Sequence, residues 1–158
     1  MGSITPCLWF DTEAEDAARH YVGLFDRAAI GTISRYGENM PRPAGTVLVV
    51  EFTLRGQPFM ALNGGPGVPF TDAISLSVDC ETQDEIDHYW NGLIDGGGQA
   101  VQCGWLKDRF GVSWQVAPRM MSDLQRNGTP EQVGRLMQAM MGMVKLDMAA
   151  LQRAFDGE

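Results

Sequence analysis

The chain has 158 residues, of which 44% are hydrophobic and 20% charged, which suits one compact domain with a single core and is too short for two ordinary domains. Its formal net charge of -8, without any local run of Lys or Arg, excludes nucleic acid as a partner because the phosphate backbone would be repelled. No apolar stretch reaches the roughly 18 to 20 residues that span a bilayer, and the N-terminus lacks a basic segment followed by an apolar run, so we expect no membrane partner and a cytoplasmic location.

The first half of the chain predicts one strand, one helix and then three strands. The run "SITPCLWF" has strand length and ends at Asp11, after which Thr12 and Glu15 fit the T-x-x-E capping box of a helix start. The helix carries an apolar stripe at 3.6-residue spacing. The runs "AAIGTISRYG", "GTVLVVEFTL" and "QPFMALNGG" follow as strands, and a tight turn at Arg55 and Gly56 joins the last two.

The second half begins as a copy of the first. A shift of 68 residues aligns "LWFDTEAEDAARHY" with "LSVDCETQDEIDHY", and six of the fourteen positions are identical. The identical pairs are Leu8/Leu76, Asp11/Asp79, Glu13/Glu81, Asp16/Asp84, His20/His88 and Tyr21/Tyr89. Thr82 with Glu85 repeats the capping box, so we interpret the acidic residues as helix-start residues rather than as a metal or acid/base cluster.

After its helix, the second copy is compressed. We predict a short strand around Gln99–Cys103, a connection over Trp105–Gly111 and a last strand over Val112–Pro118. The fold class is therefore α+β, with two βαβββ repeats over residues 3–66 and 72–118 inside one domain of residues 1–158.

A helical extension over residues 119–158 has no counterpart in the first half. Thr129, Pro130 and Gln132 mark a helix start, and Asp147 is a candidate cap for a final short helix. The apolar stripe of the first of these helices consists of Val133, Leu136, Met137, Met140, Met141 and Val144. We interpret this stripe as core or subunit contact, and it predicts a homodimer.

Two βαβββ units in an acidic chain resemble the vicinal oxygen chelate superfamily, which is the glyoxalase, bleomycin-resistance and dihydroxybiphenyl-dioxygenase fold. The stretches "GTVLVVEFTLRGQPFMALNGGP", "CETQDEIDHYW", "CGWLKDRFGVSWQVAP" and, in the tail, "MQAMMGMVKLDMAALQRAF" are similar to the PhnB-like branch, many of whose members carry the name 3-demethylubiquinone-9 3-methyltransferase. The resemblance implies that the repeats curl into an open β-cup. It also implies that enzymes of the superfamily bind a divalent metal through His, Gln or Glu of the first and last strands of each unit.

The ligand positions that the resemblance implies offer few metal donors in this chain. Those positions are Ile4 or Thr5, Met60, Asp72 or Ala73, and Gln115. Only Asp72 and Gln115 remain as weak metal candidates, and two oxygen donors without a histidine suit zinc, iron or nickel poorly. We therefore expect no cofactor, with a divalent metal at these two residues as the alternative.

Other chemistries leave little trace in the sequence. Three cysteines, odd in number and widely spaced, indicate reduced thiols rather than disulfides or a structural zinc site. The glycine-rich stretch "NGGPG" at Asn63–Gly67 precedes a further strand rather than a helix, so it is not the loop with which methyltransferases hold S-adenosylmethionine. No Ser/His/Asp order, P-loop or H-E-x-x-H occurs.

The remaining candidates are polar and aromatic side chains that would line the cup and bind a small molecule. They are Asn63, Ser75, Cys103, Trp105 and Gln115. Trp114 and Gln115 must point to opposite faces of their strand, and we place Gln115 inward. We interpret Lys107 and Asp108 as a surface ion pair.

Three functions stay open at this point. The first is a protein that binds a small molecule without a tightly held metal. The second is a metal-dependent lyase, isomerase or dioxygenase, and the third is the methyltransferase of the family name. The fold alone does not decide between them, because function belongs to the site.

Overall fold

The computed structural model describes residues 2–158, and the chain divides into two compact units, Met1–Phe70 and Thr71–Glu158. A single domain over residues 1–158 stays a prediction. Within residues 2–158, no helix has both the length and the apolar character that a membrane crossing requires.

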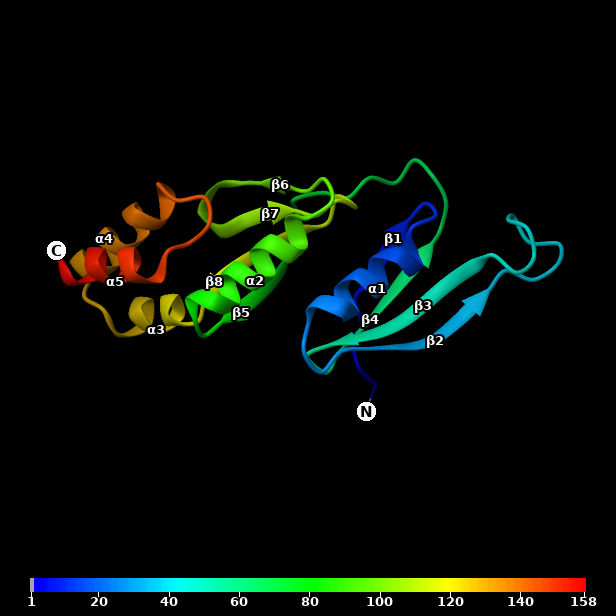
Figure 1. The fold of residues 1–158 in the computed structure, drawn as a ribbon, viewed down its shortest axis with the longest axis horizontal. Helices are drawn as coiled ribbons and strands as arrows, with labels where there is room; N and C mark the ends of the chain where they lie inside the picture. Colours follow the sequence, from blue (N-terminus) through cyan, green and yellow to red (C-terminus); the bar gives the residue numbers. More distant parts are fainter. Residues whose placement is uncertain (1) are drawn as a thin grey trace. The chain divides into compact units, whose positions relative to one another are not determined.

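The first unit follows the predicted order of strand, helix, strand, strand, strand (Figure 1). Its elements are β1 (Cys7–Phe10), α1 (Ala14–Leu24), β2 (Ala29–Arg35), β3 (Val47–Leu54) and β4 (Gln57–Asn63). β1 runs parallel to β4, and two antiparallel pairs complete a four-stranded sheet of order β1-β4-β3-β2. Arg55 and Gly56 both have positive φ, which is the pattern of a two-residue type I′ hairpin turn, as predicted.

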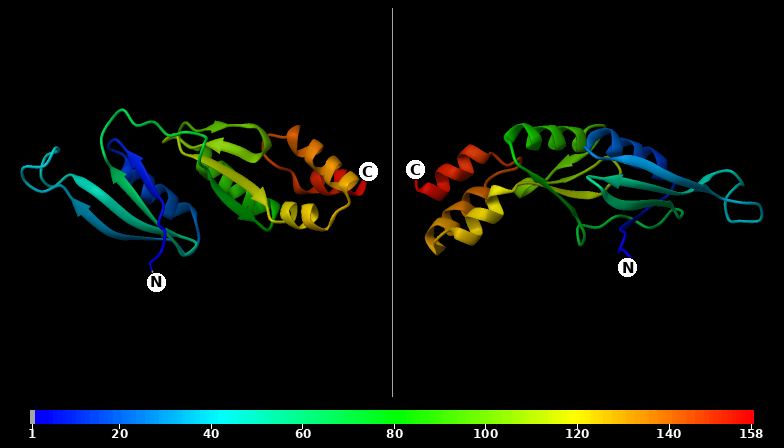
Figure 2. Two further views of the ribbon diagram at one scale, coloured as in Figure 1. Left: turned by 180° about the vertical axis from the view of Figure 1, so that it is seen from behind. Right: turned by 90° about the horizontal axis from the view of Figure 1, so that it is seen from below.

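α1 covers one face of this sheet, where it contacts β3 and β4 (Figure 1). Tyr21 of the helix is fully buried, and its ring lies 6.3 Å from the ring of Phe52, which stacks on Phe59 at 5.4 Å. Side chains alternate along a strand, so the neighbours Glu51 and Met60 point to the opposite face. No helix of the first unit lies over that face when the sheet is seen from behind (Figure 2, left).

The second unit repeats this arrangement with shorter strands and adds three C-terminal helices. Its elements are β5 (Leu76–Cys80), α2 (Gln83–Ile94), β6 (Gln99–Ala100), a 3-10 turn (Gln102–Gly104), β7 (Trp105–Lys107), β8 (Ser113–Pro118), α3 (Met120–Asn127), α4 (Pro130–Met141) and α5 (Met148–Asp156). The sheet has the order β5-β8-β7-β6, with β5 parallel to β8. α2 buries Ile86, Tyr89, Trp90 and Leu93 against it.

The predicted fold class is confirmed: the chain is α+β, with two βαβββ repeats, an open sheet in each and C-terminal helices. Two details of the prediction were wrong. Trp105–Lys107 is strand β7 rather than connection, and the strand before it is only Gln99–Ala100. Three residues are too few to show a period in the sequence, and only their pairing with β6 and with Ser113–Gln115 of β8 makes them a strand.

The C-terminal helices form a small core of their own. It consists of Met121, Leu136, Leu146, Leu151 and Phe155. The helix start at Thr129 is a complete capping box with Gln132, and the Asp147 side chain accepts a hydrogen bond from the Ala150 N–H at 2.9 Å, so both predicted caps are confirmed. α3 was not predicted as a separate helix.

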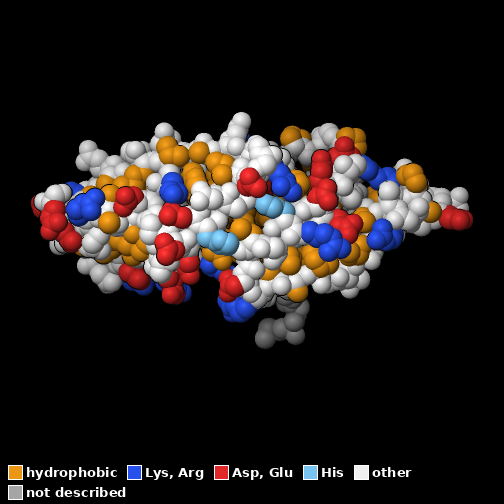
Figure 3. All heavy atoms as spheres, in the orientation of Figure 1, with side chains coloured by type: hydrophobic (Ala, Val, Ile, Leu, Met, Phe, Trp, Pro, Cys, Tyr) orange, Lys and Arg blue, Asp and Glu red, His pale blue; other side chains and the backbone are white. Residues whose placement is uncertain are grey.

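Part of the predicted apolar stripe of α4 stays at the surface. Leu136 is fully buried, whereas Met141 is 67% and Val144 41% exposed. Figure 3 shows hydrophobic side chains on the surface over the C-terminal helices, with acidic ones among them. The homodimer stays a prediction.

The two predicted T-x-x-E boxes have different outcomes. Thr82 caps α2, since its side chain accepts from the Glu85 N–H at 3.2 Å, although the Glu85 carboxylate turns to the Glu81 N–H instead of to Thr82. The N-cap position of α1 is Glu13 rather than Thr12, with no cap bond from its side chain, and Glu15 pairs with Arg19 at 2.8 Å.

This difference predicts unequal effects of two matched substitutions. Thr82→Ala is expected to lower the free energy of unfolding by about 1 kcal/mol because a helix cap is lost. Thr12→Ala is expected to stay within about 0.5 kcal/mol, as a surface substitution does. Urea unfolding of the two variants checks this, and equal losses would contradict the assignment of the caps.

Candidate functional site

The helix-free face of the second sheet gathers most of the polar residues that the sequence singled out. Trp114 and Val116 of β8 are buried on the face that α2 covers, with Trp114 only 2% exposed. Gln115, between them, points to the other face and is half-buried. The antiparallel register places Trp105 of β7 directly opposite Gln115, and the parallel register places Ser77 of β5 on its other side.

Gln115 is held in place by a hydrogen bond. Its Nε2 donates to Ser75 Oγ at 2.9 Å, just before β5 begins. With Nε2 engaged, Oε1 remains as an acceptor on the same face as the Trp105 ring. The structure therefore brings together three of the five predicted cup-lining residues.

A second polar group lies on this face at the start of β8. Ser113, which is 2% exposed, donates from Oγ to Asp72 Oδ1 at 2.7 Å, and Lys107 Nζ lies 3.3 Å from the same oxygen. The Ser113 and Lys107 hydrogen bonds hold the pKa of Asp72 below its usual value. Asp72 is therefore engaged with a cation of the protein itself. Ser113 is a member of this face that the sequence analysis missed.

Asn63 and Cys103 lie elsewhere. Asn63 ends β4 on the face that α1 covers, is 6% exposed, and uses its amide twice: Oδ1 accepts from the Ala14 N–H at 2.9 Å and Nδ2 donates to the Val47 carbonyl at 3.1 Å. Cys103 lies in the 3-10 turn before β7 with φ 63°, and its N–H donates to the Met143 carbonyl. These contacts bind parts of the fold to each other.

The pairing of Lys107 with Asp108 was predicted wrongly. Asp108 is 3% exposed, and its carboxylate accepts hydrogen bonds from the N–H groups of Phe110 and Val112 and from Trp114 Nε1 at 2.9 to 3.0 Å. It orders the turn between β7 and β8 and ties that turn to the core. Lys107 turns instead to Asp72.

The strand registers show which residue of the first unit corresponds to Gln115 of the second. Leu8 and Leu76, which correspond in the repeat, pair with Ala61 and Trp114. The counterpart of Gln115 in the first unit is therefore Leu62, and not Met60. Counting from the glycine failed because Ala61 is the fifth residue after its hairpin turn, whereas Trp114 is only the second residue after its own turn.

The donor set fits zinc, iron or nickel poorly. The described residues contain no group of three His, Cys, Asp or Glu side chains that could hold a metal ion. Asp72 and Gln115 supply oxygen donors only, whereas zinc, iron and nickel favour imidazole or thiolate ligands. The Asp72 carboxylate also forms an ion pair with the Lys107 ammonium, which a metal cation would have to displace.

The glycine-rich stretch after β4 supports no cofactor loop of the methyltransferase kind. The next element after Asn63 is strand β5, so no helix begins there. The indole of Trp9 covers the stretch, since Nε1 donates to the Gly65 carbonyl at 2.9 Å and a Cβ at Gly64 would come within 2.3 Å of the ring. The glycine is needed for this close approach.

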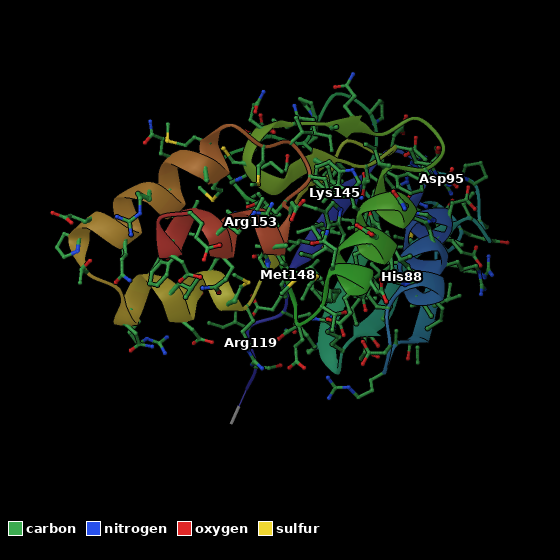
Figure 4. The ribbon with its side chains drawn as sticks, turned by 60° about the vertical axis from the view of Figure 1, so that its left-hand side comes forward. His88, Asp95, Arg119, Lys145, Met148 and Arg153 are labelled. Atoms are coloured by element: carbon green, nitrogen blue, oxygen red, sulfur yellow. The ribbon has the colours of Figure 1, made fainter. Side chains whose placement is uncertain are left out.

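A groove of about 570 Å³ lies between α2 and the start of α5. Gln83 spans it, because its Nε2 donates to the Leu146 carbonyl and its Oε1 accepts from the Met148 N–H. Lys145 pairs with Asp87 at 2.7 Å, which lowers the pKa of that carboxyl, and Figure 4 shows Lys145 and Met148 beside α2. The polar groups of the groove are thus used to fasten the C-terminal helices to α2.

A comparison with family models identifies the family of the chain, and a comparison with solved structures supports its fold. A model of the family described as 3-demethylubiquinone-9 3-methyltransferase matches residues 2–117. The match ends before α3, so the tail stretch that suggested the same family lies outside it. No curated protein matched the chain.

Solved structures agree with this placement. A putative 3-demethylubiquinone-9 3-methyltransferase, PhnB protein, from Bacillus cereus is 40% identical, with a TM-score of 0.68 over 74% of this chain and 99% of that one. A Pseudomonas aeruginosa protein (21% identical, TM-score 0.62, 75% and 98% covered) and the fosfomycin resistance protein FosX from Listeria monocytogenes, complexed with Mn(II) and sulfate (13%, 0.52, 79% and 96%), share the fold. The chain belongs to the PhnB-like family named after 3-demethylubiquinone-9 3-methyltransferase, within the glyoxalase and bleomycin-resistance fold.

Proposed function

We propose that this PhnB-like protein binds a small planar molecule on the helix-free face of its second sheet, without a tightly held metal. The observation that carries the proposal is the pairing of Trp105 with Gln115 in the β7–β8 register. The indole offers a flat apolar wall, and the Gln115 amide offers a fixed polar group beside it.

The hydrogen-bond pattern narrows the ligand chemistry. Gln115 Nε2 uses one of its two N–H groups on Ser75, and Oε1 stays available to accept a hydrogen bond from an N–H or O–H of the ligand. Lys107 and Asp72 form an ion pair beside the start of β8, so one edge of this face carries both a positive and a negative charge. A planar heteroaromatic ring with an N–H donor at its edge matches these groups.

Two matched probes test this proposal on the full chain. Quinazolin-4-one carries the ring and the N–H, and its N3-methyl derivative lacks that donor. In ¹⁵N-resolved NMR spectra, quinazolin-4-one is expected to shift the Trp105 indole and Gln115 amide signals, and Gln115→Ala should weaken its binding on the order of tenfold. Gln152→Ala, an exposed glutamine on α5, serves as the matched control.

Each alternative function has its own outcome. Equal binding of the methylated probe, or no effect of Gln115→Ala, would remove the proposed site. Binding that disappears in EDTA and returns with Mn²⁺ or Zn²⁺ would favour a metal-dependent lyase, isomerase or dioxygenase. Signal shifts at Asn63–Gly67 on addition of S-adenosylmethionine would favour the methyltransferase.

A further inference from the structure

A pocket of about 350 Å³ lies on the helix-free face of the first sheet. Its walls come from β2, β3, β4 and the segment before β1. The strand register puts Glu51 opposite Met60 and Thr53 opposite Pro58, and these four side chains share the face that α1 leaves uncovered. The volume lies in the range of about 300 to 1,000 Å³ that is usual for small-molecule sites.

Gly31 keeps the space beside Glu51 open. β2 changes register between Ile30 and Ile33, and Gly31 lies in this irregularity at the edge of the sheet. A Cβ at Gly31 would come within 3.2 Å of the Glu51 carbonyl oxygen and 3.5 Å of its Cβ. The φ of Gly31 is not in the left-handed region, so the backbone does not require a glycine here. What the glycine provides is the absence of a side chain in the pocket.

Among residues 2–158, Glu51 is the one ionisable residue that lines the pocket. Its side chain is exposed, and no lysine, arginine or histidine in the described part of the chain forms an ion pair with it. This sets it apart from Asp72 and Asp87, whose carboxylates are each paired with a lysine. A carboxylate accepts hydrogen bonds and donates none, and the net charge of -8 adds a general attraction for cations.

The rest of the lining is apolar or carries a hydroxyl group. Met60 and Pro58 supply an apolar wall, and the thioether of a methionine adapts to ligands of different shape. Thr5 and Thr53 supply hydroxyl oxygens, which can accept further hydrogen bonds. One carboxylate is too few for calcium or magnesium, which take six or more oxygen ligands. An ammonium group on an apolar body fits the lining better than a metal ion does.

We propose that this pocket binds a small organic monocation, a primary amine on an aromatic or branched apolar body. The ammonium group donates to the Glu51 carboxylate, the Thr53 hydroxyl accepts a second N–H, and the apolar body lies against Met60 and Pro58. All residues that line this site belong to the first unit, whereas Gln115 belongs to the second. It adds a second ligand class to the protein.

Three probes of nearly equal shape test the charge requirement on the full chain. They are 2-phenylethylamine, 2-phenylethanol and 3-phenylpropionate, which carry a positive, no and a negative charge. Titrations followed by the [methyl-¹³C]-methionine signal of Met60, assigned with Met60→Leu, are expected to show binding of the amine at least tenfold tighter than that of the alcohol, and none of the acid. Added salt should weaken the binding of the amine, because it screens the attraction between the ammonium group and the carboxylate. Equal binding of amine and alcohol would overturn the proposal.

Two substitutions test the residues that define the pocket. Glu51→Gln keeps the shape and removes the charge, and it is expected to weaken 2-phenylethylamine binding about tenfold. Glu38→Gln, an exposed glutamate of the same unit, is the matched control and should change nothing. Gly31→Val fills the space beside Glu51 and should abolish binding. If Gly31→Val loses its circular dichroism signal, only Glu51→Gln tests the site. An unchanged affinity of Glu51→Gln for 2-phenylethylamine would then reject it.

The two binding proposals fail separately. Gln115→Ala is expected to leave the affinity for 2-phenylethylamine unchanged, and Glu51→Gln to leave the affinity for quinazolin-4-one unchanged. Loss of amine binding in Gln115→Ala would place the amine on the second sheet and overturn the assignment to Glu51.

Discussion

Replacing Asp108 with alanine is expected to lower the free energy of unfolding by about 3 to 5 kcal/mol, because three N–H donors lose their acceptor inside the protein. These donors belong to Phe110, Val112 and Trp114, and the carboxylate that they share is 3% exposed. Asp108→Asn should cost about 1 to 2 kcal/mol, since one oxygen remains for the backbone while an amide N–H₂ meets the indole N–H of Trp114.

Urea unfolding followed by circular dichroism measures both losses. Asp123→Asn serves as the control within the same unit, because its contact with Arg126 spans 3.8 Å between exposed side chains and contributes less than about 1 kcal/mol. A loss for Asp108→Ala no larger than that of the control would show that Asp108 is not the buried acceptor of this turn.

Replacing Asn63 with alanine is expected to lower the free energy of unfolding by about 2 to 4 kcal/mol. The substitution removes the acceptor for the first N–H of α1, at Ala14, and the donor to the Val47 carbonyl, both with little access to water. Asn63 thus acts as the cap that Thr12 does not supply, from a position 49 residues along the chain.

Asn63→Asp provides a sharper comparison. Aspartate keeps an oxygen for the Ala14 N–H but turns its other oxygen toward the Val47 carbonyl, so it should recover only part of the loss. Hydrogen exchange at Ala14 reports the cap directly and should speed up in Asn63→Ala. Slow exchange there, with a ligand affinity that falls, would favour the earlier prediction that Asn63 binds the ligand.

The candidate site could be predicted only in part. Alternation along β8 places Gln115 and Trp114 on opposite faces, and this follows from sequence alone. That Gln115 lies beside Trp105 and Ser75 depends on the strand register and on a hydrogen bond between separate segments. The same alternation in "FMALN" groups Asn63 with the buried Phe59 and Ala61, and that signal was available but not used. The same alternation along β8 places Ser113 on the face of Gln115, and that signal was not used either. The pocket beside Glu51 carries no such signal, since its other walls come from other strands.

Local pattern in the sequence determined the repeat, all helices except α3, most strands and the caps at Thr82, Thr129 and Asp147. Those features depend on residues within one or two turns of each other, where periodicity and capping rules apply. The tertiary structure decided which carboxylates are paired, which cap α1 uses, and that Trp105–Lys107 is a strand. Each of these depends on contacts between separate elements: Lys107 takes Asp72 rather than its neighbour Asp108, because Asp108 is turned inward by the N–H groups of the turn and of Trp114.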